Sequence, residues 1–149
     1  MTEEKIKEYS LRISQCTRTE LVVITDEIII DYVKDAKTSF AEGNKEQFWF
    51  ALNKARQFVN ELASALDMRF EISKQLINLY SYVRSCLFRA DIRFSDEELD
   101  EVISIITRLK DSFVEVAKSD HSGSVMEHSQ KVYAGLTYGK GSKLNEIVM

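Results

Sequence analysis

The sequence predicts an all-α protein, an antiparallel up-down bundle of four long helices. The 149 residues contain no proline, and Gly43 is the only glycine before residue 123, so nothing interrupts long helices in this part of the chain. Between the breaks, apolar residues recur at helical spacing and give each helix a stripe that a core can bury. The predicted loops have only a few residues, and such loops make sequential helices antiparallel neighbours.

We expect three parts: a flexible N-terminal segment over residues 1–16, the bundle over residues 17–119, and a flexible tail over residues 120–149. The tail contains nearly all of the glycines together with serine and lysine, a composition typical of weakly ordered segments. A single domain of this length buries roughly two thirds of its unfolded surface, which is enough to fold without disulfides.

Capping patterns mark three of the four helix starts. In each, a short polar side chain stands three residues before an acid or an amide, and the two satisfy each other's free backbone amides. The third helix begins less distinctly, between residues 67 and 71. The expected helices cover about residues 18–41, 45–66, 70–91 and 96–119. The capping pairs are Thr17 with Glu20, Asn44 with Gln47, and Ser95 with Glu98.

The first helix is rich in β-branched residues, and its runs LVVIT and IIIDYV also fit two strands around residues 25–27. A helix is the better interpretation, because a capping pattern precedes the run and no glycine or asparagine serves a hairpin turn. Two neighbouring stripes leave only a narrow polar face, so this helix should be the most buried or the most covered by a partner. The stripes are Leu21, Ile24, Ile28 and Tyr32, and Val22, Ile29, Val33, Ala36 and Phe40.

The second and fourth helices each carry one stripe, whereas the third has apolar residues on more than one face. On the third helix, Ile77, Arg84 and Phe88 project away from the core stripe. This second stripe fits either a surface that meets another chain or a helix buried on both sides. The core stripes are Phe48, Leu52, Ala55, Val59, Leu62 and Leu66 in the second helix, Leu76, Leu79, Val83, Leu87 and Ala90 in the third, and Leu99, Val102, Ile106, Leu109, Phe113 and Ala117 in the fourth.

Composition limits the environment and the partners. No apolar run approaches the ~20 residues that span a bilayer, and the mixed-charge start differs from a signal peptide, so we expect a cytoplasmic protein with no membrane insertion. A net charge of -4 with interleaved signs offers no basic face, which argues against nucleic acid. Cys16 and Cys86 form no spaced pair, and reduced, buried thiols are expected.

The sequence contains no recognisable catalytic or metal-binding motif. His121 and His128 lie beyond the predicted bundle, which excludes a Glu-x-x-His di-iron site and a histidine phosphotransfer helix. Glu127 beside His128 is an isolated pair, and solvation is the better interpretation than a metal site. Phosphate-binding glycine loops, GxSxG and CxxC are absent from the sequence. We therefore expect no enzyme, no catalytic residue, no metal and no cofactor.

From residue 52 onward the chain resembles the flagellar export chaperone of flagellin, the FliS family. The resemblance is carried by LNKARQFVNELASALD, EISKQLINLYSYVRSCLFRA and EELDEVISIITRLKDSFVEVAK, and it covers roughly residues 9 to 118. At the front, Tyr9 matches a family tyrosine, but a Thr-Ala-Ser-Pro turn is replaced by QCTR, and a later Leu-Tyr-Asp-Gly group is replaced by TDEI. The hallmarks are Lys54-Ala55, Glu61-Leu62, Leu66-Asp67, Leu79-Tyr80-x-Tyr82, Leu87, Ala90 and residues 109–117.

The resemblance implies a cytoplasmic chaperone that binds the disordered C-terminal segment of flagellin, prevents premature polymerisation and supports export. It also implies that Tyr9, Leu11 and Ile13 fold onto the client groove in the free protein and leave when flagellin arrives. Trp49 and Phe50 lie off the stripe of their helix, where large aromatics need a cover.

The expected partner-binding surface joins these front residues to the second stripes. Other flagellar export or regulatory proteins and a second copy of the chain are further expected partners. The alternative is a homodimeric helical adaptor that binds no flagellin. The expected partner-binding residues are Tyr9, Ile13, Leu21, Ile24, Ile28, Trp49, Phe50, Ile77, Tyr80 and Phe88.

Overall fold

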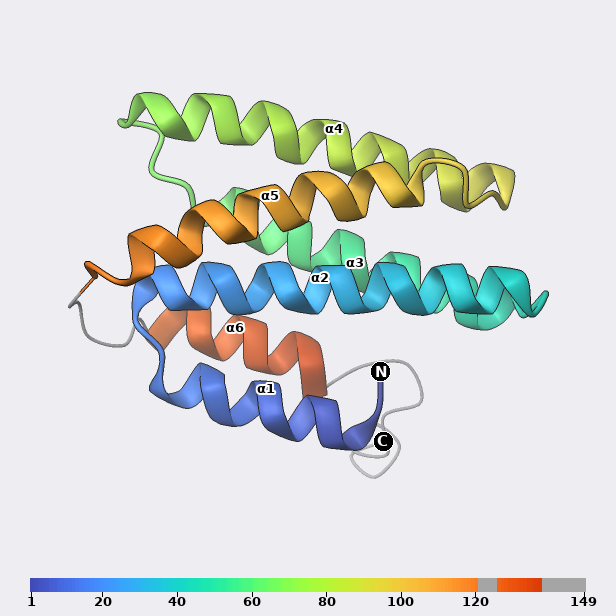
Figure 1. Cartoon of the computed structure of the whole chain (residues 1–149), viewed down its shortest axis with the longest axis horizontal. Helices are drawn as coiled ribbons and strands as arrows, with labels where there is room; N and C mark the ends of the chain where they lie inside the picture. The colour runs from blue at the N-terminus through green and yellow to red at the C-terminus, as the bar shows by residue number, and fades with distance from the viewer. Residues whose placement is uncertain (121–125, 138–149) are drawn as a thin grey trace.

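The computed structural model describes residues 1–120 and 126–137, and these residues form α-helices joined by short connections (Figure 1). The prediction of an all-α protein is confirmed, because the described residues contain no strand. The four predicted long helices correspond to α2 through α5, with ends that differ by three residues or fewer. The helices are α1 (Glu3–Gln15), α2 (Arg18–Ala41), α3 (Lys45–Ser64), α4 (Glu71–Arg93), α5 (Leu99–Ala117) and α6 (Met126–Thr137).

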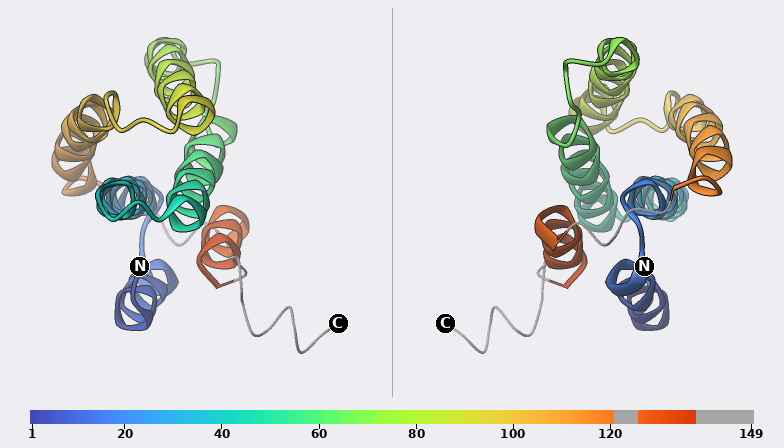
Figure 2. Two further views of the ribbon diagram at one scale, coloured as in Figure 1. Left: turned by 90° about the vertical axis from the view of Figure 1, so that its right-hand side faces the viewer. Right: turned by 90° about the vertical axis from the view of Figure 1, so that its left-hand side faces the viewer.

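The four long helices surround the main core, and the two short helices lie together on one side of it. Seen end-on, α2, α3, α4 and α5 occupy four corners, while α1 and α6 lie on the side away from α4 (Figure 2). α2 packs mainly on α3 and α5, and α6 contacts both α1 and α3. The core therefore has a second layer on one side only. Its fully buried side chains include Ile28, Ile29 and Val33 from α2, Phe48, Leu52 and Val59 from α3, Val83 and Leu87 from α4, and Leu99, Val102 and Ile106 from α5.

In two of the three predicted caps the short polar side chain caps the helix, but the return bond differs from the predicted one. The Thr17 hydroxyl accepts a hydrogen bond from the Glu20 amide at 3.2 Å, and the Asn44 side chain accepts one from the Gln47 amide at 3.2 Å. The Asn44 amide donates to the Ser39 carbonyl at 2.9 Å, and the Glu20 carboxylate accepts from the Thr17 hydroxyl at 3.0 Å. The third prediction is wrong: Ser95 accepts from the amide two residues on, that of Glu97, at 3.2 Å. That bond closes a local turn instead of capping a helix, so α5 begins at Leu99.

An aromatic cluster closes the far end of the bundle. Phe94 follows α4 with a φ of 45°, the left-handed conformation that glycine usually supplies at this position. Its ring centroid lies 5.0 Å from both Phe40 and Phe48 and 6.3 Å from Trp49. Packing against three rings offsets the backbone strain of about 1–2 kcal/mol.

Residues 3–15 form α1, where the sequence predicts a flexible segment. Thr2 caps this helix by accepting from the Lys5 amide at 3.2 Å, and Glu3 and Glu4 stand in its first turn, where the helix dipole favours acids. Tyr9 and Ile13, four residues apart, are buried. A cap and one short stripe are weak signals, and burial against α6 and α2 supplies the remaining stability.

Residues 126–137 form α6, where the sequence predicts a flexible tail. Val132 and Leu136 are 2% and 3% exposed, and their spacing of four residues places them on one face. Gly135 lies inside this helix, and glycines were the reason for predicting a loose segment. The rest of the predicted tail, residues 121–125 and 138–149, lies outside the described residues.

Candidate functional site

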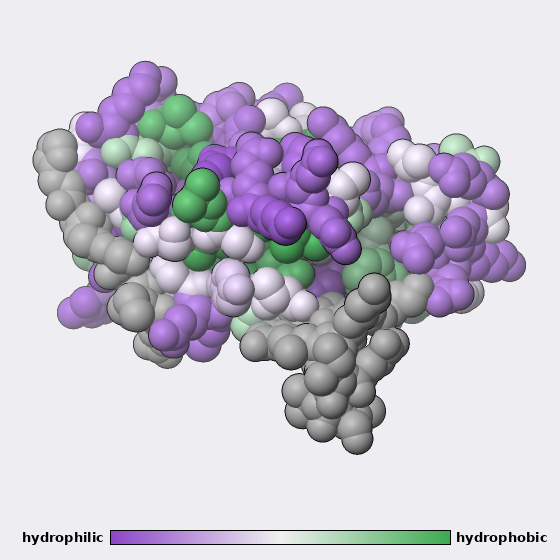
Figure 3. Space-filling model, turned by 90° about the horizontal axis from the view of Figure 1, so that it is seen from below, coloured by the Kyte–Doolittle hydropathy of each residue, from purple (hydrophilic) through white to green (hydrophobic). Residues whose placement is uncertain are grey.

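Two of the predicted contacts on α2, Leu21 and Ile24, lie beside the two short helices, and all three are buried. Leu21, Ile24 and Ile28 are at most 6% exposed. Leu21 lines a pocket with His128 and Val132 of α6, and Ile24 lines a second pocket with residues of α1. We call the surface of α2 and α3 that faces α1 and α6 the covered face. In the space-filling view of this side, apolar side chains appear in separate places between hydrophilic ones (Figure 3).

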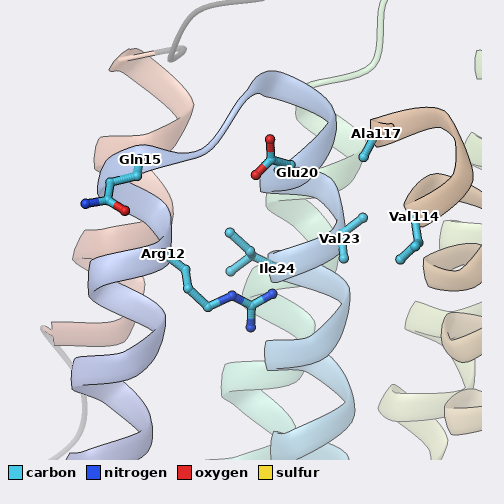
Figure 4. A pocket seen from close by; sticks show the side chains of 7 residues that line it. All are labelled: Arg12, Gln15, Glu20, Val23, Ile24, Val114 and Ala117. Carbon is cyan, nitrogen blue, oxygen red and sulfur yellow. The ribbon is translucent and has the colours of Figure 1, made fainter. Parts of the chain in front are cut away.

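A pocket of about 360 Å³ remains open between α1, α2 and α5. In Figure 4, Arg12 extends from α1 into the space beside Ile24 of α2, and Val114 approaches from α5. Val114 is 37% exposed at this edge. Ile24 itself is only 3% exposed, so the apolar surface that is accessible beside α1 is mainly that of Val114 on α5.

α1 is attached to α2 largely through polar contacts. Glu27, Asp31 and Asp35 follow one another at intervals of four residues and form a row along α2. Arg12 pairs with Glu27 at 2.5 Å, and the amino group of Met1 pairs with Asp35 at 2.6 Å. α1 thus presents positive groups that match an acidic row on its neighbour.

Tyr9 joins this polar row to the buried contacts of α1. Its hydroxyl donates to the Asp31 carboxylate at 2.5 Å, and Lys5 reaches the same carboxylate at 3.4 Å. Burial raises the pKa of the Tyr9 phenol, and the hydrogen bond to Asp31 raises it further, so the phenol remains a donor. With Ile13, which is 2% exposed, Tyr9 anchors α1 over α2.

Phe50 belongs to the covered face near the chain N-terminus. Its ring makes an edge contact with Tyr32 at 6.4 Å, and it lines a small pocket with Met1. Lys54, one turn further along α3, places its ammonium 5.9 Å from the Phe50 ring centroid. The sequence predicts Phe50 on the side of α3 opposite the core stripe, and the structure instead places it at the boundary between core and covered face.

Phe88 lies on a different surface, the α3/α4 cleft, which we define by Arg56, Asn60, Arg84 and Phe88. Trp49 lies outside the lining of this cleft. Phe88 is 54% exposed, and Trp49 is 40% exposed with its indole N–H donating to the Asp91 carbonyl at 3.2 Å. Arg84 spans the cleft and donates to Asn60 at 3.0 Å. Ile77 is half-buried on α4. The expected contacts therefore fall on two separate surfaces.

Tyr80 is a core residue rather than a surface contact. It is 1% exposed, whereas Leu79, predicted for the core stripe, is 37% exposed. Both Leu76-Leu79-Val83 and Leu76-Tyr80-Val83 are helical spacings, so periodicity alone could not choose between them. Burial raises the pKa of the Tyr80 phenol, and the nearby Asp26 carboxyl adds to the shift.

Asp26 on α2 was not singled out from the sequence. It is fully buried, and neither carboxyl oxygen has a hydrogen-bond partner among the described residues. Burial raises its pKa well above the usual range, and the neighbouring Glu27 adds to this, while Lys110 opposes it. The carboxyl lies in the core, and it lines neither the pockets of the covered face nor the α3/α4 cleft.

The described residues contain no group of three His, Cys, Asp or Glu side chains arranged to hold a metal ion. Cys16 and Cys86 are free and buried, as predicted. None of the described helices combines the length and apolar character needed to span a membrane.

A family model with the description flagellar protein FliS matches residues 4–120. The matched range contains α2 through α5 and nearly all of α1, and it ends before α6. No curated protein matches the chain.

Proposed function

The chain belongs to the flagellar protein FliS family, and we propose that it is a cytoplasmic export chaperone that binds the disordered C-terminal segment of flagellin. Binding keeps flagellin subunits from polymerising early and supports their secretion and assembly. The single observation that carries this proposal is the covered face. Two short helices lie over apolar side chains of α2 and α3, in the manner of an amphipathic helix in a groove.

The contacts that hold α1 on the covered face are weak enough for a client to displace it. Ion pairs at a surface contribute only ~0–1 kcal/mol each, and α1 relies on several of them. Tyr9 and Ile13 are its only buried residues. Ordering of a disordered client on binding costs ~2–5 kcal/mol. If α1 is held weakly, its displacement adds little to this cost, and the client binds more tightly. In this proposal, Tyr9 and Ile13 depart and flagellin contacts Leu21, Ile24, Ile28 and Phe50.

The α3/α4 cleft supplies the second contact of the proposed client. Phe88 and Trp49 are large exposed apolar side chains, and such residues gain most from being covered by a partner. Ile77 extends the apolar surface along α4, and Tyr80 supports that surface from the core. A segment that reaches both the covered face and the cleft gains the long contact that coupled folding and binding requires.

The test is a calorimetric titration of the full chain with the C-terminal segment of flagellin from the same genome, repeated at several temperatures. The proposal predicts saturable binding with a clearly negative heat-capacity change, because apolar surface becomes buried. A folded protein that releases no heat at any temperature would contradict it and would favour the homodimeric adaptor.

One pair of variants locates the cleft contact. Phe88→Ser should weaken binding roughly tenfold, as expected for a residue contributing more than ~1 kcal/mol. Ile72→Ser is the matched control, because Ile72 is 57% exposed at the other end of α4. Equal affinities of the two variants would remove the cleft from the proposed site.

A further inference from the structure

The helix α6 lies outside the residues that match the FliS family, yet it rests on α3, which lies inside them. Only one side of α6 is buried, and Tyr133 on another side is 45% exposed. A short amphipathic helix with one face on an apolar surface has the form expected of a client helix.

Lys54 binds the end of α6. Its ammonium donates to the carbonyl oxygen of Gly135 at 2.5 Å, and Lys54 is only 5% exposed. Gly135 stands in the last turn of α6, whose carbonyls lack partners within the helix. The negative end of the helix dipole adds to the attraction for a cation. Lys54 therefore acts as a C-terminal cap supplied by another helix.

Gly135 fits closely against Phe58. A Cβ atom at position 135 would lie 3.0 Å from both Cε1 and Cζ of the Phe58 ring. That ring is 2% exposed and stacks on Tyr32 at 6.0 Å, so it has little room to move. The close approach of α6 to α3 thus requires a residue without a side chain at position 135, in the last turn of α6.

Besides its contact with α1, α6 makes further contacts that continue the same groove. A pocket of about 350 Å³ lies between α2, α3 and α6, and its apolar lining comes from Leu21, Leu62 and Val132 among others. At the edge of the groove, His128 Nδ1 lies 3.3 Å from the Glu61 carboxylate. α6 therefore covers part of the covered face, and Lys54 caps its C-terminal end.

We propose that Lys54 and Phe58 form a binding site for the C-terminal turn of an amphipathic helix. In the free protein α6 occupies this site, and a helix of the flagellin segment replaces α6 in the complex. The inference rests on the proposed function, because flagellin is the client it names. Because α6 is tethered, it competes at an effective concentration that reaches millimolar for short linkers. The apparent affinity for flagellin then falls in proportion to the fraction of open molecules.

The first measurement compares full-length Gly135→Leu with the control Gln130→Leu. The first substitution forces a side chain into Phe58, and the second adds the same side chain at an exposed position of α6. Calorimetric titration should show that the flagellin segment binds Gly135→Leu roughly fivefold or more tightly than it binds wild type or the control, as expected from overpacking.

The second measurement begins without flagellin, which is added only in a final competition step. A peptide of residues 126–137 is added to isotope-labelled Gly135→Leu protein, and amide shifts in α3 report its binding. The peptide should bind, compete with flagellin, and bind roughly tenfold more weakly after Lys54→Met, as expected when a charge-assisted hydrogen bond is removed.

The two measurements separate the inference from the proposed function. If wild type and Gly135→Leu bind flagellin equally and the peptide does not bind, the inference is overturned and the chaperone function stands. If the peptide binds but neither wild type nor any variant binds flagellin, the proposed function is overturned. Flagellin is then also excluded as the helix that replaces α6.

Discussion

The buried carboxyl of Asp26 provides a quantitative test of the core. Replacing it by leucine removes a polar group that has no hydrogen-bond partner among the described residues and fills similar space with apolar atoms. An unsatisfied buried polar group costs ~1–3 kcal/mol, so Asp26→Leu should raise the free energy of unfolding by about that amount at neutral pH. Asp26→Asn keeps a polar side chain but removes the ionisation.

The sign of the pH dependence follows from the raised pKa. Below the ordinary pKa of 3.8, Asp26 is protonated in the folded and the unfolded chain, and it adds no pH dependence. Above that value the unfolded chain loses the proton first, so the free energy of unfolding falls as pH rises, by up to ~1.4 kcal/mol per pH unit. The fall continues until the pH reaches the folded pKa.

Urea unfolding at several pH values between 4.5 and 8 measures this dependence. The free energy of unfolding of wild type should fall with pH more steeply than that of Asp26→Asn, so that their difference grows toward pH 8. Asp26→Leu also removes the ionisation, so its profile should have the same shallower slope as that of Asp26→Asn. Parallel profiles for wild type and Asp26→Asn would refute a raised pKa at Asp26.

Substitutions at three further positions test the cap of α2, the attachment of α1 and the turn after α4. Thr17→Ala removes the cap of α2 and should lower the free energy of unfolding by about 1 kcal/mol in urea; no change would contradict the role of this cap. Tyr9→Phe removes a hydrogen bond to a carboxylate worth ~1.5–3 kcal/mol, so flagellin should bind more tightly in calorimetry, by roughly tenfold or more, whereas unchanged affinity would argue against release of α1. Phe94→Ala should destabilise by ~2–3 kcal/mol and Phe94→Gly by about 1 kcal/mol less, because glycine tolerates a φ of 45°; the reverse order in urea would contradict strain at this position.

Much of the fold could be predicted because the strong signals act locally. Thr17 and Asn44 cap their helices through residues three positions away, and the absence of proline leaves long helices uninterrupted. Ser95 shows the limit of such signals. The same hydroxyl can close a turn or cap a helix, and the surrounding packing decides between them.

The candidate site was harder to predict because its arrangement depends on contacts between distant segments. The second stripe of α2 indicated a covered helix, but the sequence did not show that α6 would provide part of that cover. In the sequence, Gly135 predicts a weakly ordered tail, whereas in the structure it allows close packing against Phe58. The sequence alone does not show that Phe58 lies beside it. Likewise, choosing Tyr80 over Leu79 for the core requires knowing how α4 rotates against α3 and α5.

Amide hydrogen exchange of the full chain, with and without saturating flagellin segment, tests most directly whether the client takes the covered face. The account predicts that amides of α1 exchange faster in the complex, because α1 is displaced, while amides of α2 and α3 exchange more slowly. Saturating flagellin that leaves α1 as protected as in the free protein would contradict the central claim.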